Sequence, residues 1–128
     1  MAIRIVRLGT PRAAGEGLRL GTVRRPPRGV PKSRFASGNW YDVWFPLLAP
    51  SHATVKLGRN VDSEAGWRRF ARRYRAEMKR PEAMQALDLL AALSRRTNFA
   101  VGCYCEDESR CHRSLLRELL AARGARVR

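Results

Sequence analysis

Residues 97–123 read TNFAVGCYCEDESRCHRSLLRELLAAR, and this stretch carries the clearest fold signal in the chain. Its apolar run, residues 99–105, has the length and composition of a buried strand. An acidic turn at 106–109 follows, and a series of leucines then recurs at the spacing of one buried helix face. These leucines are Leu115, Leu116, Leu119 and Leu120. A strand that leads directly into an amphipathic helix predicts an α/β protein.

The same patterns extend through the rest of the chain. We expect strands near residues 3–8, 18–23, 41–45 and 98–105, and helices near 63–79, 82–95 and 110–123. The helix at 63–79 has the plainest apolar stripe, formed by Trp67, Phe70, Tyr74 and Met78. We therefore predict a single small α/β domain over residues 1–128, with a largely parallel sheet covered by about three helices.

The chain is strongly basic, with 26 Lys and Arg residues against 11 Asp and Glu and a net charge of +15. Such a balance favours an anionic small molecule or a nucleic acid as partner. The basic residues are almost all arginine, which is also typical of a general bias in amino-acid composition that has no role in binding. No apolar run approaches about 18 residues, so no membrane association is expected. The N-terminus lacks the apolar segment of a signal peptide, which predicts a cytoplasmic protein with reduced cysteines. Nothing in the sequence indicates the oligomeric state.

All three cysteines and one of the two histidines lie near the predicted strand–helix junction, as Cys103, Cys105, Cys111 and His112. Three interpretations stay open. Cys111 is a candidate catalytic thiol, because a helix N-terminus and nearby cations lower a thiol pKa, and His112 is a candidate general base. The four side chains also have the types and number that tetrahedral zinc requires. Alternatively, the cysteines are simply buried.

The zinc interpretation meets one difficulty in the spacing. A strand directs Cys103 and Cys105 to one face, but adjacent Cys111 and His112 would diverge on a helix. We therefore assign no residue as a metal ligand, although zinc remains a possible cofactor.

A second candidate feature is the segment RRPPRGVPK at residues 24–32, which its prolines make an extended loop. It is either a solvated loop or an arginine lip that holds phosphate or carboxylate. In the second case Arg24, Arg25, Arg28 and Arg113 line an anion site at the 105–113 junction. Four further residues are expected to support this site: Asp42 and Glu106, which would hold the arginines in place, with Cys105 and Ser114.

The string Cys105-Glu106-x4-Cys111-His112-Arg113-Ser114, followed by paired leucines, resembles the C-terminal motif of the bacterial domain-of-unknown-function 488 family. Further segments, in order along nearly the whole chain, resemble its YeaO-like branch. They are Gly17-Leu18-Arg19, Pro27-Arg28-Gly29-Val30, Leu48-Ala49-Pro50-Ser51 and Trp67-x2-Phe70-x3-Tyr74-x2-Glu77. The resemblance implies a compact α/β cytoplasmic protein without an established activity. That branch tends to carry an Asp-Arg pair and a tryptophan before Pro-Arg-Gly, where this chain has Thr22-Val23-Arg24-Arg25-Pro26.

The leading hypothesis is an anion-binding protein, and beyond that an enzyme on a phosphorylated or nucleotide-like substrate with Cys111 or His112 as the reactive group. The first alternative is a non-catalytic nucleic-acid-binding module that uses the basic face of the 63–79 helix. The second alternative is a zinc-binding protein that uses the Cys/His cluster. The sequence does not decide whether the chain is an enzyme.

Overall fold

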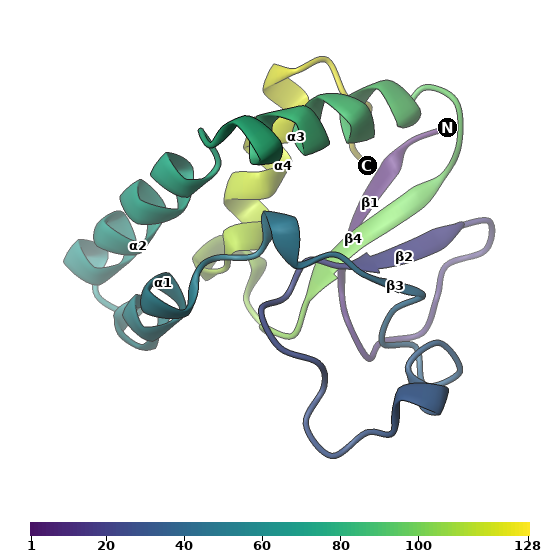
Figure 1. Ribbon diagram of the computed structural model, residues 1–128, viewed down its shortest axis with the longest axis horizontal. Helices are drawn as coiled ribbons and strands as arrows, with labels where there is room; N and C mark the ends of the chain where they lie inside the picture. Colours follow the sequence, from purple (N-terminus) through teal and green to yellow (C-terminus); the bar gives the residue numbers. More distant parts are fainter.

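A computed structural model describes residues 1–128, and its centre is a four-stranded sheet (Figure 1). The strands are β1 (Ile3–Arg7), β2 (Leu18–Gly21), β3 (Val43–Trp44) and β4 (Phe99–Cys103). They lie in the order β1-β4-β2-β3, and every neighbouring pair is parallel. The helices are α1 (His52–Leu57), α2 (Glu64–Glu77), α3 (Pro81–Leu93) and α4 (His112–Ala122). The prediction of a small α/β domain with a parallel sheet is confirmed, with one short helix more than expected.

Strand β4 is the last strand in the sequence, but it lies inside the sheet. Its residues Phe99–Cys103 are all buried, with Ile3 of β1 opposite Phe99 on one side and Leu18 of β2 opposite it on the other. A parallel strand buried in this way has a continuous apolar sequence, which explains the clear signal at 99–105. Because β1, β4 and β2 run in the same direction, their carboxyl ends meet at one edge of the sheet. In open α/β sheets this is the edge where ligands bind.

The helices pack against one face of the sheet. The main core joins Ile3, Phe99 and Val101 of the sheet to Leu116 and Leu120 of α4. It also takes in the apolar stripe predicted for α2, formed by Phe70, Ala71, Tyr74 and Met78. No helix is long and apolar enough to cross a membrane.

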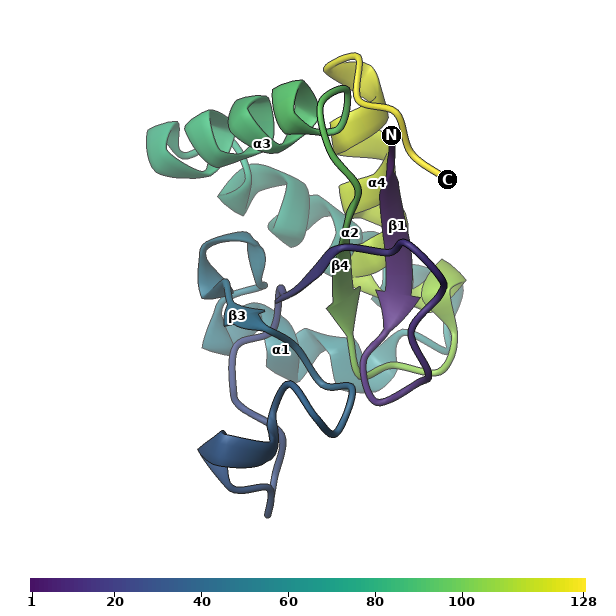
Figure 2. The same cartoon turned by 90° about the vertical axis from the view of Figure 1, so that its right-hand side faces the viewer.

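Loops cover the opposite face, so the expected helical cover holds for one side only. Leu20 packs against the main core, and the next residue, Gly21, therefore faces the other side. There the ring of Tyr41 lies 2.4 Å from the position that a Cβ on Gly21 would take. The ring of Trp40 lies 2.9 Å from the position that a Cβ on Gly9 would take, and the φ of +91° at Gly9 also favours glycine. Figure 2 shows α4 behind β1 and β4 and the loop that follows β1 in front of them.

Helix α1 was not expected from the sequence, because its short turn is stabilised by a distant residue. Ser51 caps the helix by accepting a hydrogen bond from the Thr54 amide. The carboxylate of Glu77, at the end of α2, accepts hydrogen bonds from the Ser51 amide (3.0 Å) and the Thr54 hydroxyl (2.9 Å). His52 is the first residue of this helix.

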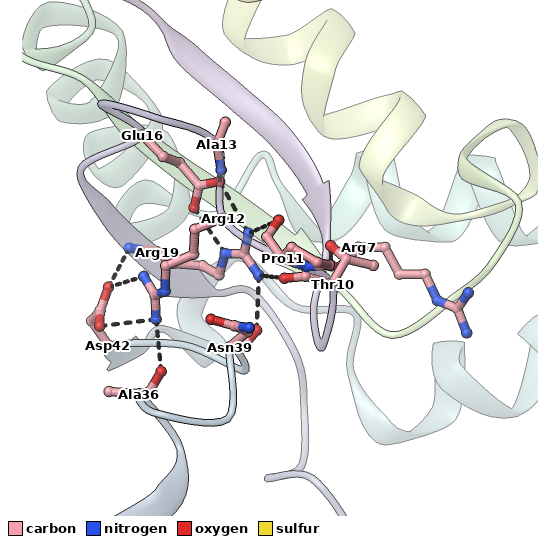
Figure 3. Close-up of polar contacts among 10 residues, drawn as sticks. All are labelled: Arg7, Thr10, Pro11, Arg12, Ala13, Glu16, Arg19, Ala36, Asn39 and Asp42. Atoms are coloured by element: carbon pink, nitrogen blue, oxygen red, sulfur yellow. Dashed lines mark hydrogen bonds and ion pairs between the residues drawn. The ribbon is translucent and has the colours of Figure 1, made fainter.

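A buried arginine on β2 organises the loop-covered face (Figure 3). Arg19 is fully buried and forms an ion pair of 2.8 Å with the equally buried Glu16. A guanidinium group has five N–H donors, and all five of them have an acceptor here. Two bonds go to the Glu16 carboxylate, and three go to the carbonyl oxygens of Thr10, Pro11 and Asn39. Arg19 therefore ties the loop after β1 and the segment before β3 to the sheet.

The acidic partners in this network are held in their charged form. Burial raises the pKa of Glu16, but the hydrogen bonds from Arg19 and the Ala13 amide outweigh it and bring the pKa below its ordinary value. The pKa of Asp42 is lowered in the same way: burial raises it, and hydrogen bonds from the Arg12 side chain and the Arg19 amide outweigh that effect. Asp42 contacts Arg12 at 2.8 and 3.1 Å.

We predict that Arg19→Met lowers the free energy of unfolding by about 3–5 kcal/mol, because it leaves the Glu16 carboxylate buried without its partner. Urea unfolding followed by circular dichroism measures this loss. The matched control is Arg75→Met, which breaks an exposed ion pair with Glu118 and should cost less than about 1 kcal/mol. Equal effects of the two substitutions would contradict the role of Arg19.

Candidate functional site

A pocket of about 510 Å³ opens at the carboxyl ends of β1 and β4. Its walls come from the loop after β1, the predicted arginine loop, the segment before β3 and the residue after β4. The lining residues are Arg7, Leu8, Gly9, Thr10, Pro27, Arg28, Trp40 and Tyr104. The pocket therefore occupies the edge that the parallel topology selects for ligands.

Two arginines with exposed side chains give the pocket its positive charge. Arg28 has no hydrogen bond or ion pair with another residue, so all its donors face solvent. Arg7 donates from Nε to the carbonyl oxygen of Tyr104 (3.3 Å) and lies 3.6 Å from the exposed carboxylate of Glu106. An exposed contact of that length contributes little. Both guanidinium groups are therefore available to an anion.

Two aromatic side chains form the apolar part of the wall. Trp40 and Tyr104 meet edge to face, with ring centroids 5.9 Å apart. The Tyr104 hydroxyl donates to the carbonyl oxygen of Arg25 (2.8 Å), which ties the arginine loop to the end of β4. Burial raises the pKa of Tyr104, and this keeps the phenol protonated as that donor.

The Cys/His cluster lies beside the pocket, beneath the surface. Cys103, Cys111 and His112 are 8%, 1% and 3% exposed, whereas Cys105 is exposed. The ligand atoms of the three buried residues lie within 4.8 Å of one another, and the sulfurs of Cys103 and Cys105 are 3.7 Å apart. The expected divergence of Cys111 and His112 is wrong: Cys111 Sγ is 3.7 Å from His112 Nδ1. The reason is that Cys111 precedes α4 in an extended conformation (φ −126°, ψ 154°) instead of lying within the helix.

A backbone carbonyl group fixes the orientation of the His112 imidazole. Its Nε2 lies 2.8 Å from the carbonyl oxygen of Thr22, an acceptor only, so the neutral ring carries its proton on Nε2. Nδ1, with its lone pair, then faces Cys111. The Thr22 hydroxyl donates to the carbonyl oxygen of Gly102 (3.0 Å) and so links β2 to β4 at this point.

Among the three neighbouring thiols, negative charge is favoured on Cys111. Hydrogen bonds from Cys103 and Cys105, and a smaller contribution from His112, lower the pKa of Cys111. Hydrogen bonding to Cys105 and Cys111, together with burial, raises the pKa of Cys103. Hydrogen bonding to Cys103 lowers the pKa of Cys105, but hydrogen bonding to Cys111 and burial together outweigh this effect. The pKa of Cys105 is therefore raised. Cys111, next to the N-terminus of α4, is thus the thiol that ionises most easily.

Arg113 is a buried cation without an acidic partner. Its side chain donates to the carbonyl oxygen of Cys105, its Nε has no acceptor, and the residue is 3% exposed. No carboxylate forms an ion pair with it. A buried charge requires compensation, and the anionic groups that interact with Arg113 are the Cys105 thiol and the exposed carboxylate of Asp107.

The residues predicted for one site thus separate into two. Arg28 lines the pocket, whereas Cys111, His112 and Arg113 do not. Arg24 turns away and donates to the carbonyl oxygens of Pro46, Ala49 and Pro50. Arg25 is exposed, and only its backbone oxygen has a described role, as the acceptor of Tyr104.

The expected supporting contacts also need correction. Asp42 was expected to hold an arginine of the 24–32 loop, but it binds Arg12 and the Arg19 amide, because β3 places it beside β2. Glu106 lies near Arg7 instead of that loop. Ser114 donates to the carbonyl oxygen of Cys111 (3.0 Å) and so stabilises the first turn of α4.

Sequence reasoning missed three polar or aromatic residues of the pocket: Arg7, Thr10 and Tyr104. Arg7 ends β1, and the rule that ligands bind at the carboxyl ends of parallel strands points to it once the neighbouring strands are known. Trp40 is both packed against Gly9 and part of the pocket wall.

The fold and these two clusters define a small basic α/β protein with a charged pocket and a Cys/His cluster at one sheet edge. The family model described as the active DUF488-N3 subclade matches residues 3–124. The chain therefore belongs to the domain-of-unknown-function 488 family, as its motifs indicated; the narrower YeaO-like placement is not confirmed. No curated protein and no solved structure matches the chain.

We predict that the neutral imidazole of His112 is the Nε2–H tautomer, because the Thr22 carbonyl accepts that proton. Two-dimensional ¹⁵N–¹H correlation of the ring nitrogens at pH 8 distinguishes the tautomers. His52 is the internal control: it is exposed and has no partner, so it should show a mixture of both. A dominant Nδ1–H form at His112 would contradict the geometry.

Proposed function

We propose that this protein binds an anionic small molecule, phosphorylated or nucleotide-like, in the pocket at the carboxyl ends of β1 and β4. The observation that carries the proposal is the pair of available guanidinium groups, Arg7 and Arg28, on the wall of one pocket. Guanidinium groups bind phosphate through charge-assisted and often paired hydrogen bonds. The aromatic surfaces of Trp40 and Tyr104 suit a base or another flat apolar group beside the phosphate.

Preorganisation supports the same proposal. One guanidinium nitrogen of Arg19 donates to the carbonyl oxygens of Thr10 and Asn39 (2.8 Å each); Thr10 lines the pocket, and Asn39 directly precedes Trp40, which also lines it. The Gly9 amide donates to the same Asn39 carbonyl oxygen (2.9 Å). These bonds hold two walls at a set distance before any ligand arrives, which lowers the ordering cost of binding. The description of the matched family as an active subclade favours an enzyme that acts on such a molecule over a passive binder.

We predict that Arg28→Ala and Arg7→Ala each weaken binding of adenosine monophosphate by roughly tenfold or more, because each removes a charge-assisted contact. Isothermal titration calorimetry measures the Kd, with inorganic phosphate as a second probe without a base. Arg25→Ala is the matched control, because it removes an equally exposed arginine from the same loop but outside the pocket lining, and it should change the Kd by less than about twofold. Wild-type affinity in both pocket variants would exclude this site.

A second candidate function, nucleic-acid binding, is favoured by the exposed face of α2. Three of its arginines, Arg69, Arg72 and Arg73, are exposed and have no acidic partner, and the same is true of Lys79 just after the helix. Salt separates the two functions. Binding of an oligonucleotide to α2 should weaken steeply as ionic strength rises, whereas binding of one small anion in the pocket should weaken much less.

A further inference from the structure

The Cys/His cluster lies outside the pocket lining, and the spacing of its ligand atoms is compatible with a metal ion. The ligand atoms of Cys103, Cys111 and His112 lie within 4.8 Å of one another, and Cys105 Sγ is 3.7 Å from Cys103 Sγ. Two sulfurs bound to a tetrahedral zinc at about 2.3 Å each are about 3.8 Å apart. The separation of Cys111 Sγ and His112 Nδ1, 3.7 Å, is close to the corresponding sulfur–nitrogen edge. Three ligand atoms are thus already grouped, and Cys105 Sγ lies next to one of them.

The imidazole is already oriented as a ligand. In metal sites the ring nitrogen that does not bind the metal almost always donates its proton to a carbonyl or carboxylate oxygen. His112 does this through Nε2, which lies 2.8 Å from the Thr22 carbonyl oxygen, and its Nδ1 faces the sulfurs. Nε2 can therefore keep its partner when a metal binds, and Nδ1 is the nitrogen left to bind the metal.

The electric charge at the site supports a metal independently. Arg113 is 3% exposed, no carboxylate pairs with it, and its Nε has no acceptor. A zinc ion with three thiolates and one neutral imidazole carries a net charge of −1. Arg113 donates to the backbone of one of these ligands, Cys105, and its positive charge balances that site. The buried arginine then has a close counter-charge, which no carboxylate supplies by a direct ion pair.

A solvent-reactive thiol fits these observations less well, because Cys111 is 1% exposed and lies outside the pocket. We propose that Cys103, Cys105, Cys111 and His112 form a structural zinc site, which joins the end of β4 to the start of α4 and is neutralised by Arg113. The four protein ligands complete the coordination, so the zinc holds the fold together and has no free position for a substrate.

The test uses the full chain, purified without a histidine tag, stripped with a chelator and titrated with Zn²⁺ or Co²⁺. We expect one zinc per chain by elemental analysis. Cobalt should give the visible bands of tetrahedral coordination and an ultraviolet thiolate charge-transfer band. Cys103→Ser, Cys105→Ser and Cys111→Ser should each lower that band by about a third, in keeping with three thiolates. His112→Gln should weaken zinc binding, whereas His52→Gln, which removes the other histidine, should bind like the wild type.

Arg113 provides a test that does not change a ligand. Arg113→Met should weaken zinc binding by about tenfold or more, and Arg113→Lys, which keeps the charge, should recover part of the loss. Zinc at about 100-fold excess over its Kd should raise the wild-type melting temperature by roughly 5–10 °C.

Several results would overturn the proposal: no zinc bound to the wild type, an octahedral cobalt spectrum, or a loss of binding in His52→Gln equal to that in His112→Gln. The first two are measured on the wild-type chain, so they hold even if a cysteine variant does not fold. Binding of adenosine monophosphate is measured separately, so failure of the zinc site is distinguishable from failure of the pocket.

Discussion

The buried guanidinium of Arg19 is the interaction on which the loop-covered face of this protein depends. Helices supply an apolar layer on only one face of the sheet, and the other face is closed by irregular segments whose backbone carbonyls need donors. Arg19 supplies donors to Thr10, Pro11 and Asn39 and is itself neutralised by Glu16. A buried charged side chain thus adds to the small apolar cluster of Leu8, Val23 and Tyr41 on this face. It is stable there only while every one of its polar groups is paired.

The position of Arg19 also explains where the candidate sites are. The two segments that Arg19 holds continue directly into the pocket walls. Their positions are therefore fixed by a hydrogen-bond network in which every guanidinium donor is paired. The Cys/His cluster depends on a different constraint, the meeting of β4 with α4, where an extended residue before the helix turns its sulfur toward the neighbouring imidazole. Two sites with different chemistry therefore share one sheet edge without sharing side chains.

The sequence predicted the features that rest on local periodicity. The apolar run of β4, the stripe of α2 and the leucines of α4 each describe one buried face, and the parallel topology followed from their alternation. It did not predict α1, because that short helix depends on Glu77 from 20 or more residues away. The sequence also could not predict that Arg12 is the partner of Asp42, because each of the 23 arginines has the right charge. Only part of the pocket could be predicted. Arg28 was a candidate because its proline-rich loop is basic, whereas Arg7 can be found only when it is known which strand ends are neighbours.

The central claim, that Arg19 is a saturated internal donor and not one more surface charge, is tested most directly by proton exchange of arginine side chains. In ¹⁵N-labelled protein, we expect the Nε–H signal of Arg19 to exchange with water orders of magnitude more slowly than that of exposed Arg68. A bond to the Glu16 carboxylate should also shift the Arg19 signal away from those of the surface arginines. Exchange of Arg19 as fast as that of Arg68 would show that its guanidinium reaches solvent and would contradict this account.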